Sequence, residues 1–99
     1  MLNIGKEKNG SEMTVALTGR LDTMTAPDLE RELKDSLDGV TALTMDLKEL
    51  EYISSAGLRV LLSTQKVMNR QGTMVVKNAS EIVKEIFEVT GFTDILTIE

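Results

Sequence analysis

The hydrophobic residues of this chain switch repeatedly between two spacings, and this switching limits the fold more than any other feature. Near the N-terminus, Leu2 and Ile4, and then Met13, Val15 and Leu17, occur at every second position, as in β-strands with one buried face. An Asn-Gly pair at positions 9 and 10 lies between the two runs. Because Asn-Gly favours the tight turns of hairpins, the first two strands are expected to pair antiparallel.

Three later segments have hydrophobic residues three or four positions apart, which is the spacing of an α-helix with one buried face. In the first segment Leu29, Leu33 and Leu37 share a face, and Thr25 followed by Asp28 is typical of a helix N-cap. The residues expected to begin and to stop the three helices are, in pairs, Thr25 and Gly39, Ser55 and Gly72, and Ser80 and Gly91.

Three further strands are expected, at Val40–Leu47, Thr73–Lys77 and Ile95–Ile98. The order of elements is therefore ββαβαβαβ over residues 1–99, a length that suits one domain. Strands that are joined through helices run parallel. The predicted fold class is thus α/β, with a mixed, mainly parallel β-sheet and helices packed on it. The second helix should bury Leu58, Leu61 and Leu62 in the core.

The composition argues against several kinds of function. The chain has no histidine and no cysteine, which removes serine–histidine catalysis and the usual zinc sites. Neither GxxxxGK[ST] nor GxGxxG occurs, and no calcium-loop spacing is present. We therefore expect no enzyme activity, no catalytic residue, no metal and no cofactor. Since the sequence has no membrane-spanning run and no signal peptide, we expect a cytoplasmic protein without membrane insertion.

The charge is unevenly distributed along the chain. The net charge of −5 argues against binding to nucleic acid or to an anionic membrane. Residues 52–80 nevertheless contain Arg59, Lys66, Arg70 and Lys77 and no acidic residue. These cations fit a solvated helix face, where the helix dipole favours positive charge near the C-terminal end. They also fit a binding face for an acidic partner, and the sequence leaves both interpretations open.

The segment EYISSAGLRVLL, at residues 51–62, joins the end of a strand to the start of a helix. Open α/β sheets commonly place functional sites at such junctions. Capping explains Ser54, because a serine oxygen can accept a backbone N–H bond at a helix start. Capping does not explain Ser55, which would enter the first turn with its hydroxyl near the surface. A phosphate there would meet the positive end of the helix and Arg59, four residues later on the same face.

Three blocks of this sequence resemble the STAS domains, a family that includes the anti-sigma-factor antagonists of bacterial partner-switching systems and the soluble domains of sulfate transporters. The blocks are VALTGRLDTMTAPDLERELK, TALTMDLKELEYISSAGLRVLL, and the last helix with GFTDILTI. The middle block is the most specific, because its strand, its serine turn and its Gly-Leu helix start follow in the family's order. The resemblance covers almost the whole chain and implies one STAS domain over residues 1–99.

The resemblance implies a phosphorylation switch at the serine turn. In antagonists of this family, an anti-sigma-factor kinase of the GHKL type phosphorylates a serine, and a PP2C-type phosphatase reverses the reaction. The unphosphorylated antagonist sequesters the kinase and frees the sigma factor. Aligned by its glycine, the target motif Asp-Ser-(Ser/Thr)-Gly falls on Ser54, Ser55, Ala56 and Gly57. Ser55 therefore takes the acceptor position, with Ser54 as the alternative. Ser54 replaces the usual aspartate, and Ala56 replaces the second hydroxyl.

The same resemblance implies a partner-binding surface around this turn, comprising Asp22, Ser54, Gly57 and Arg59. Asp22 lies in the loop before the first helix, and its other interpretation is a turn residue that accepts local N–H groups. Met24, in the same loop, is expected to pack rather than to contact a partner. Asp46 is expected to cap or brace a neighbouring loop rather than to bind a partner.

Two other functions stay open at this point. One is a STAS scaffold subunit of a membrane transport complex, which would act without phosphorylation, and the departure at Ser54 is compatible with it. The other is a module that binds or hydrolyses a nucleotide, but no Gly-rich loop and no catalytic base in the sequence supports this activity.

Overall fold

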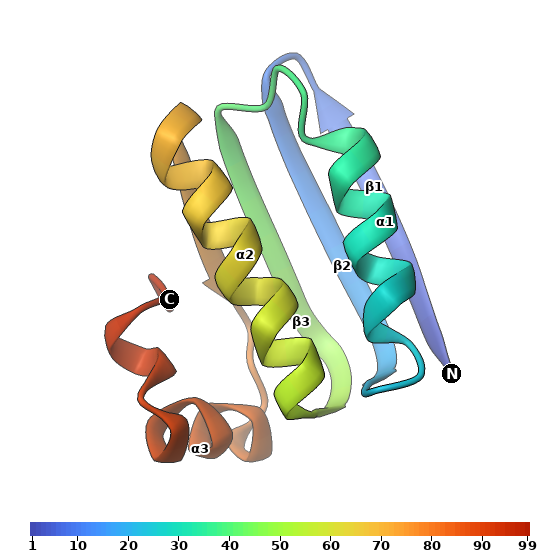
Figure 1. Ribbon diagram of the computed structural model, residues 1–99, viewed down its shortest axis with the longest axis vertical. Coiled ribbons are helices and arrows are strands. Elements are labelled where there is room, and N and C mark those ends of the chain that lie inside the picture. The colour runs from blue at the N-terminus through green and yellow to red at the C-terminus, as the bar shows by residue number, and fades with distance from the viewer.

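A computed structural model of the chain describes residues 1–99, and it contains one four-stranded sheet with helices packed against it (Figure 1). In chain order the elements are β1 (Leu2–Asn9), β2 (Glu12–Leu21), α1 (Ala26–Ser36), β3 (Ala42–Ile53), α2 (Ser55–Gln71), β4 (Thr73–Lys77), α3 (Glu81–Thr90) and a short 3-10 helix (Phe92–Asp94). The strands lie in the order β1-β2-β3-β4. The pair β1–β2 is antiparallel, and the other two pairs are parallel. The predicted α/β fold with a mixed, mainly parallel sheet is confirmed.

The first two strands form the expected hairpin. Asn9 pairs with Glu12, so only Gly10 and Ser11 make the turn between them. Gly10 has a φ of 67°, a value that glycine adopts without steric cost. The turn therefore begins one residue after the asparagine of the Asn-Gly pair.

The core lies between one face of the sheet and the helices α1 and α2, which Figure 1 shows side by side in front of β2 and β3. Side chains of β2 alternate as period 2 requires, with one set buried against the helices and the other set exposed. On α2, Leu58 and Leu61 are buried as expected, but Leu62 is only half-buried because it lies at the flank of the buried face. None of the helices is both long enough and apolar enough to span a membrane.

The strand β3 is longer than the expected Val40–Leu47, because it continues to Ile53. Its pairing with β2 has two register irregularities, and at each of them β3 contains one residue more than β2. The buried residues Leu47, Leu50 and Ile53 consequently lie three positions apart. Because of this spacing, a period-2 pattern does not identify the second half of the strand. The strand continues to the turn that precedes α2.

The expected final strand at Ile95–Ile98 forms only a single parallel bridge, between Val76 of β4 and Ile98. Two backbone hydrogen bonds hold it, from Val76 N–H to Thr97 C=O at 2.8 Å and from Glu99 N–H to Val76 C=O at 2.8 Å. The reason is local: the 3-10 helix that follows α3 occupies residues on the way to the sheet edge, so few residues remain extended beside β4. The order ββαβαβα is therefore followed by a bridge and not by a full strand.

Candidate functional site

Two loops meet at the carboxyl end of the parallel strands β2 and β3. Leu21 and Ile53 pair in register as the last residues of these strands. Immediately beyond them, the N–H of Ser54 donates to the C=O of Leu21 at 2.9 Å. This bond joins the start of the turn at Ser54 to the residue just before the loop that starts at Asp22. The structure brings together the two segments on which the sequence placed the candidate site.

Ser54 is the N-cap of α2, as the capping interpretation expected. Its backbone is extended, with φ −95° and ψ 175°, and its Oγ accepts a hydrogen bond from Gly57 N–H at 3.4 Å. Its C=O accepts the first helical bond, from Leu58 N–H at 2.9 Å. The side chain is half-buried. The hydroxyl of Ser54 is therefore committed to the start of the helix.

Ser55 is the first residue of α2, and its side chain is exposed. Its hydroxyl has no hydrogen-bond partner within the chain. The N–H groups of Ser55 and Ala56 precede the first helical hydrogen bond, so they belong to the positive end of the helix dipole. The predicted helix start near Ser55, with an exposed N-terminus, is confirmed. The two serines thus differ in their environment although they are neighbours.

Gly57 is buried where α2 comes closest to the ends of β2 and β3. A Cβ atom at this position would lie 2.7 Å from Leu21 Cγ and 2.9 Å from Ile53 Cγ1. Only glycine therefore lets the first turn of α2 approach the sheet this closely. Gly57 shapes the serine turn from inside the fold, and its expected contact with a partner stays a prediction.

The carboxylate of Asp22 binds groups of its own loop. Its Oδ1 accepts hydrogen bonds from Met24 N–H at 3.0 Å, from Thr25 N–H at 3.2 Å and from the Thr25 hydroxyl at 3.2 Å. Partial burial works to raise the pKa of Asp22, but these hydrogen bonds to the ionised form outweigh it, so the pKa lies below its usual 3.8. The geometry favours the local interpretation of Asp22, as a residue that orders the loop.

Thr25 does not cap α1 in the way that its spacing to Asp28 predicted. It occupies the N-cap position, yet its side chain makes no capping hydrogen bond. Its Oγ1 instead accepts from Asp22 N–H at 2.9 Å, and its single O–H proton is shared between Arg20 C=O at 2.9 Å and the Asp22 carboxylate at 3.2 Å. Asp28 pairs with Arg31, at 3.4 Å. The capping box is replaced because the buried Thr25 hydroxyl has better partners in the preceding loop.

Met24 lies in the same loop and is 84% exposed. The expectation that it packs was wrong, because its backbone N–H is held by Asp22 while its side chain extends into solvent. A sequence signal existed: Met24 lies in a short loop, outside the repeating apolar positions of any helix or strand.

Arg59 is exposed on the first turns of α2 and has no ion-pair partner. It lines a hollow of about 190 Å³ between the starts of α1 and α2, together with Thr23, Ala26, Pro27, Glu30, Ala56 and Val60. Lys66 and Arg70, further along α2, are also exposed and unpaired, whereas Lys77 pairs with Glu99 at 3.7 Å. Arg70, in the last turn of α2, fits the helix-dipole interpretation. Arg59, at the opposite end, does not.

Asp46 braces a loop, as expected. Its Oδ1 accepts from Lys48 N–H at 3.1 Å and from the side-chain amide of Asn78 at 3.1 Å. Asn78 follows β4 and has a φ of 60°, so the hydrogen bond helps to hold a conformation that few residues adopt.

Comparison with known proteins agrees with this geometry. A family model described as "Mlab, STAS domain" matches residues 4–97. The anti-sigma-B factor antagonist of Bacillus subtilis (strain 168) is 31% identical over 98 residues, which are 98% of this chain and 90% of that protein. The crystal structure of an anti-sigma factor antagonist from Mycobacterium paratuberculosis has a TM-score of 0.89 at 23% identity and covers 99% of this chain and 85% of the other.

The Bacillus cell fate determinant SpoIIAA in its phosphorylated form is a further structural neighbour. It has a TM-score of 0.76 at 16% identity, over 98% of this chain and 91% of that chain. At such identities the two solved structures establish a common fold. The family model and the Bacillus subtilis relative extend the likeness to the sequence over nearly the full length. The chain therefore belongs to the STAS domain family.

Proposed function

We propose that this chain is an anti-sigma-factor antagonist, a binding protein that acts in the cytoplasm and is controlled by phosphorylation of Ser55. When Ser55 carries a free hydroxyl, the chain sequesters an anti-sigma-factor kinase of the GHKL type. When Ser55 is phosphorylated the complex dissociates, and a PP2C-type phosphatase restores the binding form. The names of its relatives, which are anti-sigma-factor antagonists, support this role.

One observation carries the proposal: the hydroxyl groups of the two serines in the turn differ in exposure and in hydrogen bonding. The Ser54 hydroxyl is half-buried and bonded to Gly57 N–H, whereas the Ser55 hydroxyl is exposed and unbonded. A kinase must reach the acceptor oxygen and must replace its hydrogen, so an accessible hydroxyl is the better substrate. This difference favours Ser55 over Ser54 as the acceptor.

A phosphate on Ser55 would be tolerated by the fold. It would add about −1.5 to −2 charges at the positive end of α2, where negative charge is favourable by about 0.3–1 kcal/mol. Arg59, unpaired and one turn later, supplies a cation on the same side of the helix. The effect of the phosphate is therefore expected on the partner, whose surface would have to desolvate a new dianion.

The first test is direct. The chain is incubated with the GHKL-type kinase encoded in the same genome and with ATP, and the modified residue is located by mass spectrometry. We expect one phosphate on Ser55, its loss in Ser55→Ala, and its retention in Ser54→Ala. A phosphate on Ser54 would show that the acceptor has been misassigned by one residue, and no phosphate at all would contradict the switch.

Substitution provides the second test. Ser55→Asp should keep its melting temperature within a few degrees of the parent but bind the kinase at least about tenfold more weakly, equivalent to ~1.4 kcal/mol. Ser55→Ala should bind the kinase and stay bound after ATP is added. Calorimetric titration and thermal unfolding measure the two quantities. Equal kinase affinity of parent and Ser55→Asp would contradict the proposal.

A second candidate is a scaffold subunit that binds without phosphorylation. Ser54, which stands in place of the usual aspartate, is compatible with this candidate. Purification of the tagged chain from its host with its bound proteins separates the two candidates. Recovery of membrane-transport subunits, with unmodified Ser55, supports the scaffold and contradicts the antagonist.

A further inference from the structure

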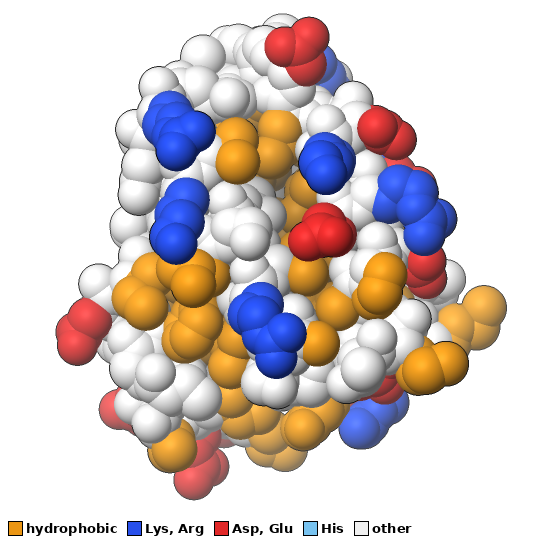
Figure 2. All heavy atoms as spheres, viewed as in Figure 1, with side chains coloured by type: hydrophobic (Ala, Val, Ile, Leu, Met, Phe, Trp, Pro, Cys, Tyr) orange, Lys and Arg blue, Asp and Glu red, His pale blue; other side chains and the backbone are white.

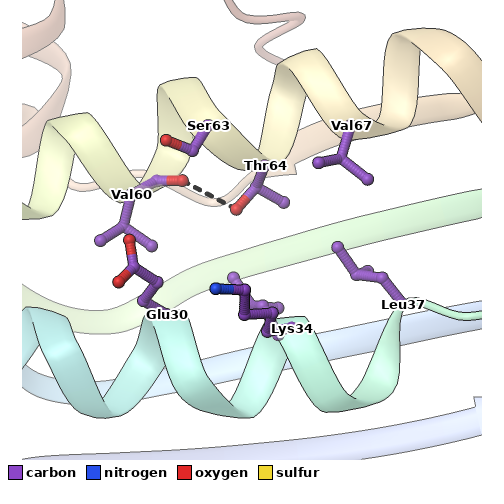
Figure 3. A pocket seen from close by; sticks show the side chains of 8 residues that line it. Glu30, Lys34, Leu37, Val60, Ser63, Thr64 and Val67 are labelled. Atoms are coloured by element: carbon purple, nitrogen blue, oxygen red, sulfur yellow. Dashed lines mark hydrogen bonds between the residues drawn. The ribbon is translucent and has the colours of Figure 1, made fainter.

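An apolar groove runs between α1 and α2 on the helical face of the molecule. It has a volume of about 270 Å³ and is lined by Glu30, Leu33, Lys34, Leu37, Val60, Ser63, Thr64 and Val67. Figure 3 shows side chains of α1 and α2 facing each other across it. The groove shares Glu30 and Val60 with the hollow beside Arg59, so the two lie next to each other along the helices. At 41% exposed, Val67 makes one wall of the groove accessible to solvent.

Unpaired cations border this groove. Lys34 lines it from α1, and Arg59, Lys66 and Arg70 lie along the exposed side of α2, with no carboxylate within ion-pair distance of any of the four. Figure 2 shows Lys and Arg side chains on both sides of the apolar strip between the helices. Glu30 is the only acidic residue in the lining. On a chain of net charge −5, this face is therefore locally positive.

The helix α3 presents the complementary surface. Val83 and Phe87 are buried in the core, while Ile82 is 60% and Val89 is 80% exposed. Ile82, Ile86 and Val89 are four and three positions apart, so they form one apolar stripe. Ile86 is half-buried against the core, and all three line a shallow hollow with Glu85 and Thr90. Glu81, Glu85 and Glu88 are exposed on the same helix, against the single cation Lys84.

The groove and the outer side of α3 are complementary in apolar area and in charge, and they are similar in length. The groove has an apolar floor and a positive border, and α3 has an exposed apolar stripe with acidic neighbours. The 10 residues of α3 span about 15 Å and the 11 residues of α1 span about 17 Å at 1.5 Å per residue. Within one copy, Val83 and Phe87 fix α3 in the core, so its outer stripe faces away from its own molecule.

We propose that the chain associates with itself head to tail, with α3 of one copy docked in the α1–α2 groove of the next. The contacting surfaces are different on the two copies, so each copy retains one free groove and one free α3 after pairing. Assemblies therefore lengthen with concentration, or close into a ring of three or more copies, instead of stopping at a symmetric dimer. The attraction between exposed charges is screened by salt, so association is stronger at low ionic strength.

The test measures molar mass by analytical ultracentrifugation from micromolar to millimolar concentration in low salt. The groove variant is Lys34→Glu with Arg70→Glu, and the α3 variant is Ile82→Ser with Val89→Ser. All four residues are exposed, and circular dichroism confirms that the variants are folded. Arg31→Glu with Lys48→Glu is the control, because it reverses the same number of exposed charges outside the groove.

We expect the mass of the parent and of the control to rise with concentration, and each double variant to associate at least about tenfold more weakly. An equimolar mixture of the groove variant and the α3 variant should form a one-to-one dimer and nothing longer, because the mixture contains one working groove and one working α3. A parent that stays monomeric, a parent that stops at a dimer, or a mixture that does not associate would each overturn the proposal. If the parent is monomeric and the groove variant loses a partner protein instead, the groove belongs to that partner.

Discussion

The absence of one methyl group at position 57 sets how closely α2 can approach the sheet. Because a Cβ atom there would lie 2.7 Å from Leu21 Cγ, Gly57→Ala must displace either the helix start or Leu21. We expect a loss of about 1–3 kcal/mol in the free energy of unfolding, as for other overpacked cores. Denaturant titration measures this loss, with Ser63→Ala, an exposed change on the same helix, as the control. A Gly57→Ala variant as stable as the parent would contradict the close packing of the turn.

Asp22 makes the stability of the fold depend on pH. Its pKa is lower in the folded chain than the usual 3.8, so the folded state favours the ionised form. The resulting stability is fully present above the unfolded pKa and is lost as the pH falls through 3.8 toward the lower folded value. Asp22→Asn should therefore be less stable than the parent at neutral pH, and the difference should shrink in acid.

Urea titrations at a series of pH values measure this difference. Asp35→Asn, which removes an exposed carboxylate of α1, is the matched control, because it also removes one negative charge but lies outside the loop. If the stability gap between the parent and Asp22→Asn stays constant down to the acid range, the hydrogen bonds of the carboxylate do not stabilise the loop.

At the level of the helix, α2 contains two adjacent leucines with different surroundings. Leu61 is fully buried in the core, whereas Leu62 is half-buried at its edge. Leu61→Ala should cost about 2–5 kcal/mol in the free energy of unfolding, because it leaves a cavity, and Leu62→Ala should cost clearly less. The pair is its own control, since the two changes are chemically identical. Equal losses in a denaturant titration would show that the helix is rotated about its axis from the position described here.

The helices and the first two strands could be predicted because their periodicity repeats over several turns or pairs. In α1, Leu29 and Leu33 are one turn apart and both buried. The serine turn could be predicted for a similar reason, since N-caps follow local chemistry and Ser54 needs only the N–H of Gly57. Local rules of this kind do not depend on the rest of the chain.

The remaining features depend on contacts between segments that are distant in the sequence. The end of β3 lost its period-2 pattern because its pairing with β2 contains extra residues. The Thr25 side chain bonds to Arg20 C=O instead of capping α1. This bond depends on the conformation of the loop, which the sequence pattern does not give. The exposure of Met24 follows in turn from the same loop. Tertiary context therefore overrode sequence patterns mainly around the candidate site.

For the molecule as a whole, the elements differ in how firmly they are attached. The strands β2 and β3 lie inside the sheet with a neighbour on each side, whereas the segment after α3 joins the sheet through two hydrogen bonds at Val76. We expect amide hydrogen exchange to be slowest in the centre of β2 and β3 and fastest in residues 92–99, because local opening there breaks few contacts. Exchange followed by mass spectrometry measures this order. Protection of residues 92–99 equal to that of β3 would show that the final bridge is as strong as a full strand.

The extra residues of β3 have a consequence for how such a chain can vary over generations. Side chains of a strand alternate between its two faces, so losing or gaining one residue in β3 without a compensating bulge would turn every later side chain of that strand to the opposite face. Ile53 would leave the core, and the serine that follows it would be carried to the other side of the sheet. The exposed hairpin turn at Gly10 and Ser11 carries no such constraint. We expect descendants of this sequence to tolerate insertions at the hairpin and to keep the residue count of β3 unchanged.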